Sequence, residues 1–332
     1  GYDLTGLGEA CLVAFSYAQT RAMGWAVIAT GAALGLTWIA PDKWVMGWQT
    51  ALALSGALAM SSTAIVVKLM AERLEMESEH GKRVMGVLLF QDLAVVPLLV
   101  LIPALGASAE LLFETLLIAS VKAIVLISVL LVGGQAVMRW WLTLVARRKS
   151  EELFVLNLLL ITLGLAWLTE LAGLSLALGA FIAGMLISET EYKQQVETDI
   201  RPFHDVLLGL FFISIGMMLD WRLVLERWPL VLLLVTLPVL FKAAIVTLLA
   251  RLLGATEGVS LRTGLYLAQA GEFGFVLLTL AQSNALVPPA LLNPILASMV
   301  ISMLATPFII MYSNLIVLKL VSSEWLQQSL QM

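Results

Sequence analysis

Apolar stretches long enough to cross a lipid bilayer recur along the whole chain. A helix needs about 20 mostly apolar residues to span the hydrocarbon core. Of the 332 residues, 61% are hydrophobic and only 13% are charged, about half the charged fraction of soluble domains. We therefore predict an all-α polytopic membrane protein, with about ten helices and no soluble domain within 1–332. The predicted spans are 22–40, 47–70, 84–105, 111–137, 153–170, 173–188, 205–219, 229–251, 262–282 and 291–318.

The basic residues predict how these spans are oriented. One alternating set of loops holds twelve Lys and Arg residues, from Arg73 to Lys319, whereas the opposite set holds only Lys43, Arg222 and Arg227. Cytoplasmic loops of membrane proteins are enriched in Lys and Arg. We therefore expect the first set and the C-terminus to face the cytoplasm. The polar stretches 71–82 and 189–204 are expected to be loops.

Several protein classes do not fit the residues present. A single cysteine, Cys11, excludes an internal disulfide and a cysteine-clustered metal site. The two histidines, His80 and His204, lie in or near polar loops, which argues against a membrane haem protein. The sequence contains no Gly-rich phosphate loop, Walker pattern or zinc motif. We expect a protein that is not an enzyme, with no cofactor in this chain and no nucleic-acid partner.

Asp92 is the residue that points most directly to a function. It interrupts 86–105, an otherwise uncharged apolar run, where an acid costs about 2.5–3.5 kcal/mol on insertion scales. Burial favours the neutral form of a carboxylate, so Asp92 would exchange a proton near neutral pH. The amide oxygen of the preceding Gln91 suits a hard cation. A site that binds a proton or a cation, never both, is a minimal antiporter; the alternative is a neutralised carboxylate that serves packing.

Ser61, Ser62 and Thr63 lie inside the span 47–70. Two interpretations are open. The hydroxyls bond back to carbonyls one turn earlier in a continuous helix, or they mark a helix break that frees oxygens toward an ion. Discontinuous helices at the bilayer midplane are typical of the substrate sites of secondary transporters.

A second interruption, QAGEFG at 269–274, lies in the span 262–282. Its glycines each weaken a helix by roughly 1 kcal/mol, and Glu272 is a second acid at membrane depth. A structural role for Glu272 and direct ion binding are both open. The spans 47–70 and 262–282 run in opposite directions, so two broken helices would cross with opposed dipoles near Asp92.

Lys242 lies in the middle of the span 229–251. A lysine at this depth is expected to pair with an acid, here Asp92 or Glu272. It would serve as a fixed counter-charge, or it would carry a proton itself, because burial favours the neutral amine.

Together these motifs resemble one known family. The chain is similar, from about residue 45 to 315, to the cation:proton antiporter-2 family, and most similar to its potassium-efflux (Kef-type) branch. The residues that carry the resemblance are SSTAIV (61–66), LLFQD (88–92), GLSLALGAFIAGMLISETEY (173–192), LLGLFFISIGMMLD (207–220), the mid-span Lys242 and LAQAGEFGF (267–275).

The resemblance implies a cation/proton antiporter fold with inverted repeats and two crossed discontinuous helices. The family has thirteen helices, so the predicted spans would be the last ten, with the first three missing. A mobile core, around 47–105 and 229–318, would move like an elevator against dimerisation helices around 111–219 of a homodimer. Gln91 and Asp92 would bind the cation and the proton alternately.

The resemblance also implies K+/H+ exchange, with Na+ as the alternative cation, in the inner membrane of a bacterium. Kef-type members carry a cytoplasmic nucleotide-binding domain after the last helix, and NAD or AMP is expected only with such a domain. Glutathione-gated members have a His-Ala-Leu motif at the position where this chain reads KQQV (193–196). This departure argues against gating by glutathione. The alternatives are a gated, channel-like potassium protein of the same fold and an ion sensor that does not transport.

Overall fold

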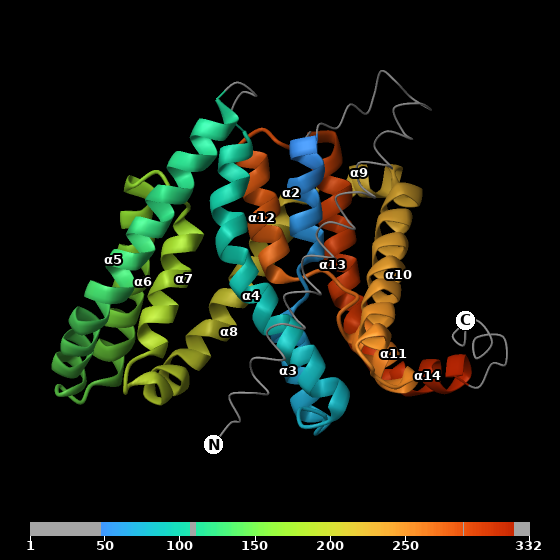
Figure 1. The fold of residues 1–332 in the computed structure, drawn as a ribbon, viewed down its shortest axis with the longest axis horizontal. Helices are drawn as coiled ribbons and strands as arrows, with labels where there is room; N and C mark the ends of the chain where they lie inside the picture. Colours follow the sequence, from blue (N-terminus) through green and yellow to red (C-terminus); the bar gives the residue numbers. More distant parts are fainter. Residues whose placement is uncertain (1–47, 107–110, 288, 322–332) are drawn as a thin grey trace. The chain divides into compact units, whose positions relative to one another are not determined.

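The structure is a computed structural model, and it describes residues 48–106, 111–287 and 289–321. These residues form helices joined by short loops (Figure 1), and seven of the described helical segments are long and apolar enough to cross a membrane. In chain order the helices are α2 (Trp48–Ala59), α3 (Thr63–Glu72), α4 (Glu79–Leu105), α5 (Leu112–Ala146), α6 (Glu151–Leu171), α7 (Leu176–Ser188), α8 (Lys193–Met218), α9 (Trp221–Glu226), α10 (Trp228–Leu252), α11 (Glu257–Tyr266), α12 (Glu272–Ser283), α13 (Pro289–Met311) and α14 (Ser313–Val321).

The chain divides into two compact units. One unit takes the described residues up to Val95 together with those from Leu219 onward, and the other takes Val96–Met218. α4 therefore begins in the first unit and ends in the second. Pro97, which cannot donate a helix hydrogen bond, follows this boundary. The assignment of these parts to a mobile core and a dimerisation domain stays a prediction.

In the first unit, two pairs of short helices replace two continuous membrane spans. Residues 60–62 separate α2 from α3, and residues 267–271 separate α11 from α12. α2 packs along α12, and α10 packs against α11 and α13 (Figure 1). Apolar side chains from α3, α4, α10, α11 and α13 form a buried cluster beside the breaks. Its members include Val66, Leu88, Val246, Tyr266 and Ile310.

The second unit consists of the end of α4 followed by α5, α6, α7 and α8. α6 and α7 pack so closely that a side chain on Gly179 would overlap Thr169 and the carbonyl of Leu165. Small residues allow this kind of close approach between membrane helices. Many large apolar side chains of α5 face outward, as Val132 does with 82% of its surface exposed. Such a surface is typical of contact with lipid or with another membrane helix.

The predicted fold class is confirmed, because each predicted span on described residues corresponds to one helix or to two half-helices. Several predicted boundaries were wrong. The stretch 189–204 is not a loop, since α8 begins at Lys193 and continues through Pro202. Its Lys, Gln and Glu residues are good helix formers, so the helix extends into this polar segment. α5 likewise continues beyond residue 137 to Ala146.

The predicted span 291–318 is two helices, since α13 ends at Met311 and α14 begins at Ser313. The Ser313 hydroxyl bonds to the carbonyl of Ile310 at 2.7 Å, a local bond of the kind that competes with helix continuation. The stretch 71–82 is shorter as a loop than predicted, because α3 runs to Glu72 and α4 begins at Glu79. The predicted span 22–40, Cys11 and Lys43 lie outside the described residues.

Candidate functional site

The first helix break, between α2 and α3, is shaped by hydroxyl side chains. Ser62 has an extended backbone (φ −75°, ψ 108°), and its Oγ accepts a hydrogen bond from the Ile65 N–H at 3.2 Å. This N-cap satisfies one of the donors that the first turn of a helix leaves unpaired. Thr63 then opens α3. The hydroxyl run therefore marks a true break in the helix.

Two glycines allow the second broken helix to lie against the first. A Cβ on Gly271 would lie 2.5 Å from the carbonyl carbon and oxygen of Ser61, and one on Gly274 would lie 2.5 Å from the carbonyl oxygen of Ala57. Backbone atoms cannot move aside as a flexible side chain does, so this crossing requires glycine at both positions. The Ser61 Oγ also donates to the carbonyl of Leu267 at 2.9 Å, which joins the two breaks directly.

Lys242 of α10 bridges the two breaks from one side. Its ammonium donates to the carbonyl of Met60 at 2.8 Å and to that of Gln269 at 2.5 Å, and the residue is only 1% exposed. Carbonyls at a helix C-terminus lack helical partners and carry partial negative charge. The Lys242 side chain thus joins the carbonyl that directly follows α2 to a carbonyl in the break between α11 and α12.

Two carboxylates lie at the opposite, N-terminal ends of the half-helices. The Thr63 Oγ1 lies 3.3 Å from both carboxylate oxygens of Asp92 and donates to them. The backbone N–H of Ala64 donates to Glu272 Oε1 at 3.2 Å. Because the N-terminus of α3 carries partial positive charge, it attracts both acids. Asp92 and Glu272 are each half-buried.

Gln91, next to Asp92, is buried and bonded at both ends of its amide. Its Oε1 accepts from the Ser61 N–H at 2.9 Å, and its Nε2 donates to the carbonyl of Ala59 at 3.4 Å. The side chain therefore spans the break between α2 and α3. It satisfies one donor and one acceptor that the break frees.

All the candidate residues identified from the sequence meet at this crossing, within the first unit. They are Ser61, Ser62, Thr63, Gln91, Asp92, Lys242 and Glu272. Ser302 of α13 was not expected at the crossing from the sequence, yet its Oγ accepts from the Ala270 N–H at 3.2 Å. No role was expected for the Gln269 side chain either, although the QAGEFG motif contains it. A serine in an apolar helix gives no signal of its distant partner.

The crossing brings hard oxygen ligands to a carboxylate at membrane depth. Carboxylate, hydroxyl and amide oxygens coordinate hard cations. The same carboxylate takes up a proton when no cation neutralises it. The site is therefore chemically suited to an alkali cation in one state and a proton in another.

A second polar cluster links the loop after α3 to the end of α11. Glu75 accepts hydrogen bonds from Arg73 Nε at 3.1 Å and from the Tyr266 hydroxyl. The His80 ring lies edge-on to Tyr266, with ring centres 5.5 Å apart. Desolvation raises the pKa of Glu75, but the hydrogen bonds from Tyr266 and Arg73 outweigh it and hold that pKa below the ordinary 4.5. The charged form of Glu75 is therefore favoured in the folded protein.

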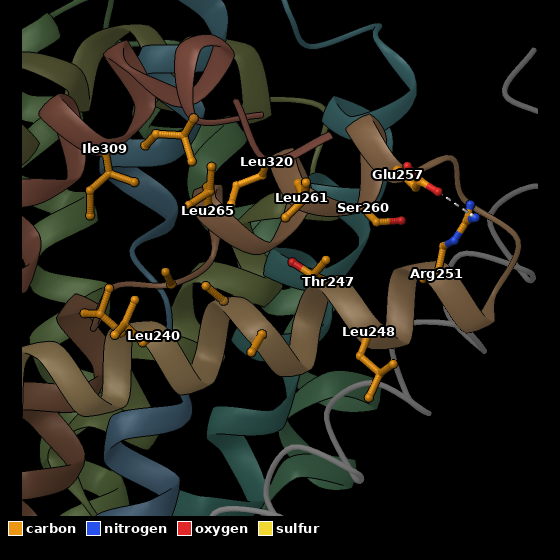
Figure 2. A pocket seen from close by; sticks show the side chains of 15 residues that line it. Leu240, Thr247, Leu248, Arg251, Glu257, Ser260, Leu261, Leu265, Ile309 and Leu320 are labelled. Atoms are coloured by element: carbon orange, nitrogen blue, oxygen red, sulfur yellow. Dashed lines mark hydrogen bonds and ion pairs between the residues drawn. The ribbon is translucent and has the colours of Figure 1, made fainter. Parts of the chain in front are cut away.

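A groove of about 500 Å³ lies between α10, α11, α13 and α14 (Figure 2). Its walls are mostly apolar, with side chains such as Leu240, Leu265 and Ile309. Toward one end Arg251 and Glu257 form an ion pair with an N–O distance of 3.2 Å. None of the candidate residues at the crossing lines this groove. Apolar walls offer few ligands to a cation, so the groove is separate from the candidate site.

The family model described as "Sodium/hydrogen exchanger, transmembrane" matches residues 14–311, which is most of the chain. The chain belongs to this family. The crossed half-helices and the acids of this sodium/hydrogen exchanger domain thus lie inside the matched region.

Named relatives of the exchanger domain are potassium efflux antiporters. The putative K(+) efflux antiporter KefB of Alkalimonas amylolytica is 40% identical over 321 residues, which cover 95% of this chain and 48% of the relative. K(+) efflux antiporter 2, chloroplastic, of Arabidopsis thaliana is 39% identical over 292 residues, 85% of this chain and 24% of the relative. K(+) efflux antiporter 3, chloroplastic, of the same plant is 38% identical over 262 residues, 78% of this chain and 34% of the relative. The predicted membership of the cation:proton antiporter-2 family, Kef-type branch, is confirmed. The chain spans about half or less of the length of these relatives.

Proposed function

We propose that the protein exchanges K+ for H+ across a membrane, with Asp92 as the residue that binds one or the other. The observation that carries the proposal is the position of Asp92, half-buried at the N-terminus of α3 in the crossing of two broken helices. Its contact with Thr63 is long and shared between both carboxylate oxygens, so a cation or a proton would displace it easily. The names of the relatives support K+ rather than Na+ as the cation.

A single carboxylate that takes either ligand couples their movements. K+ binds when Asp92 is ionised, and protonation of Asp92 releases it. Lys242 would serve as the fixed positive charge that holds the half-helix ends, and Glu272 as the acid that caps α3. Because both breaks and Asp92 lie in the first unit, we assign the moving part of an elevator-type cycle to that unit.

The cellular setting is part of the same proposal. The protein would act as a homodimer in the inner membrane of a bacterium, with its C-terminus in the cytoplasm. The excess of Lys and Arg on one set of loops supports this orientation. A regulatory domain that binds a nucleotide such as NAD or AMP is proposed by likeness to the Kef-type branch.

The test is proton movement in proteoliposomes that contain the full-length protein and a pH-sensitive dye. Added K+ is expected to drive proton movement in wild type, and Asp92→Asn is expected to abolish it. Asp205→Asn, the same change at an exposed residue of α8, is the matched control and should behave as wild type.

Other outcomes would replace the proposal. K+ flux without coupled proton movement would indicate a channel-like protein. K+ binding without flux would indicate a sensor. Full coupled exchange by Asp92→Asn would remove Asp92 from the mechanism.

A further inference from the structure

Two glutamine side chains are buried at the helix crossing, and the structure uses them differently. Gln91 is 3% exposed and Gln269 is 1% exposed. Both polar atoms of the Gln91 amide have a partner: Oε1 accepts from the Ser61 N–H, and Nε2 donates to the Ala59 carbonyl. Gln91 is therefore committed to holding the break between α2 and α3.

The amide of Gln269 is not committed in this way. Its Oε1 and Nε2 are both buried, and neither has a hydrogen-bond partner among the described residues. Its backbone, in contrast, is held on both sides, by Lys242 at the Gln269 carbonyl and by Ser302 at the N–H of Ala270. A buried polar group without a partner is unfavourable and rare, and a bound ion or water is a common reason for one.

A second unpartnered oxygen lies in the same segment. Glu272 uses Oε1 to accept the Ala64 N–H, while its Oε2 is buried without a partner among the described residues. Ala64 directly follows Thr63, whose hydroxyl donates to Asp92, so both acids contact the first turn of α3. The second break thus holds uncommitted oxygen atoms at the same helix crossing that contains Asp92.

We infer that the Gln269 carboxamide is a ligand of the transported cation, whereas Gln91 is a positioning residue that holds the first break open. An amide oxygen replaces a water of hydration around an alkali cation without adding charge. Because this ligand is neutral, the single positive charge of the cation has only the single negative charge of Asp92 to balance. The inference rests on the proposed function and names a residue that determines affinity and specificity at the same site.

The two assignments predict opposite effects on stability. Methionine has nearly the shape of glutamine and no amide. Gln269→Met removes a buried amide that has no partner within the described part of the chain. The full-length protein in detergent without K+ should therefore unfold at the same Tm as wild type or higher. Gln91→Met leaves the Ser61 N–H and the Ala59 carbonyl without their partner, so its Tm should fall.

Cation binding and transport provide the second readout. The Tm of wild type is expected to be higher in a K+ salt than in the same concentration of a choline salt. The Tm of Gln269→Met should not differ between the two salts. In proteoliposomes Gln269→Met should raise the KM for K+ at least tenfold and change the ratio of the KM values for K+ and Na+. Gln269→Leu is the second variant if Gln269→Met does not yield folded protein.

Two results would overturn the inference alone. One is that the Gln269 variants gain as much Tm with K+ as wild type does and have the wild-type KM for K+. The other is that their Tm is lowered while the KM for K+ is unchanged, which would give Gln269 a purely structural role. If wild type itself shows neither a K+-dependent Tm gain nor K+-dependent proton movement, the proposed function fails and takes this inference with it.

Discussion

The helix crossing and the Glu75 cluster are both polar, and both join the α2–α3 segment to the α11–α12 segment, but their polar groups differ in hydrogen bonding. In the cluster, one oxygen of Glu75 accepts from Arg73, and the other accepts from Tyr266. At the crossing, the Gln269 amide and one oxygen of Glu272 are buried without partners among the described residues. A satisfied network stabilises a fold. Unpartnered groups in a well-packed region indicate a functional site, where a protein retains locally unfavourable features.

Removing Lys242 should have the largest effect on the crossing. In Lys242→Met the carbonyls of Met60 and Gln269 lose a buried charged donor, which should lower the free energy of unfolding by about 2–5 kcal/mol and abolish transport. Thermal unfolding in detergent and proton flux in proteoliposomes measure both effects. Lys122→Met, which changes an exposed lysine of α5, is the control. Wild-type behaviour of Lys242→Met would contradict the bridging role.

The close contact of the two broken helices should be the next most sensitive feature. Gly271→Ala places a Cβ 2.5 Å from the backbone of Ser61, so the half-helices must move apart. We expect a loss of about 1–3 kcal/mol in unfolding free energy, together with loss of transport. Gly133→Ala in α5, where nothing lies within 4 Å of the added Cβ, should be neutral or slightly stabilising. Equal effects of the two variants would argue against the crossing.

The Glu75 cluster should affect stability and leave ion affinity unchanged. Glu75→Gln removes the charge that Arg73 and Tyr266 stabilise, which we expect to lower the free energy of unfolding by about 1 kcal/mol at pH 7. The KM for K+ should not change. Glu77→Gln, at an exposed acid in the same loop, is the control.

The pH dependence of this Glu75 effect has a definite sign. The folded pKa of Glu75 lies below the ordinary 4.5, so its stabilisation is fully present above that value and is lost as the pH falls through the folded pKa. The Tm difference between wild type and Glu75→Gln should therefore shrink below about pH 4.5. A difference that grows in acid would contradict the assigned hydrogen bonds.

The sequence predicted the class of fold and pointed to the charged and polar residues that meet at the crossing, because both depend on strong local signals; the roles of those residues stay predictions. Apolar runs fix membrane spans, and a charge such as Asp92 or Lys242 inside one is conspicuous. Ser61, Ser62 and the glycines of QAGEFG have low helix preference, so a break was one of the two interpretations open at 61–63, and the structure decides for it.

Partners of side chains were much less predictable. Lys242 was expected to pair with an acid, which stays a prediction, whereas the bonds that its Nζ donates to the carbonyls of Met60 and Gln269 were not foreseen. The bonds made by the Gln91 amide, and the lack of a partner for the Gln269 amide among the described residues, also depend on tertiary packing. Polar segments such as the start of α8 were misassigned because hydropathy marks where a helix enters the membrane, not where it ends.

The central claim, that Asp92 holds either K+ or H+, is tested most directly by proton release from the purified full-length protein in weakly buffered detergent. Adding K+ at a pH where Asp92 is protonated should release about one proton for each K+ bound, since one carboxylate cannot hold both. Asp92→Asn should release none, and Asp205→Asn should match wild type. K+ binding without proton release, or undiminished release from Asp92→Asn, would contradict the account.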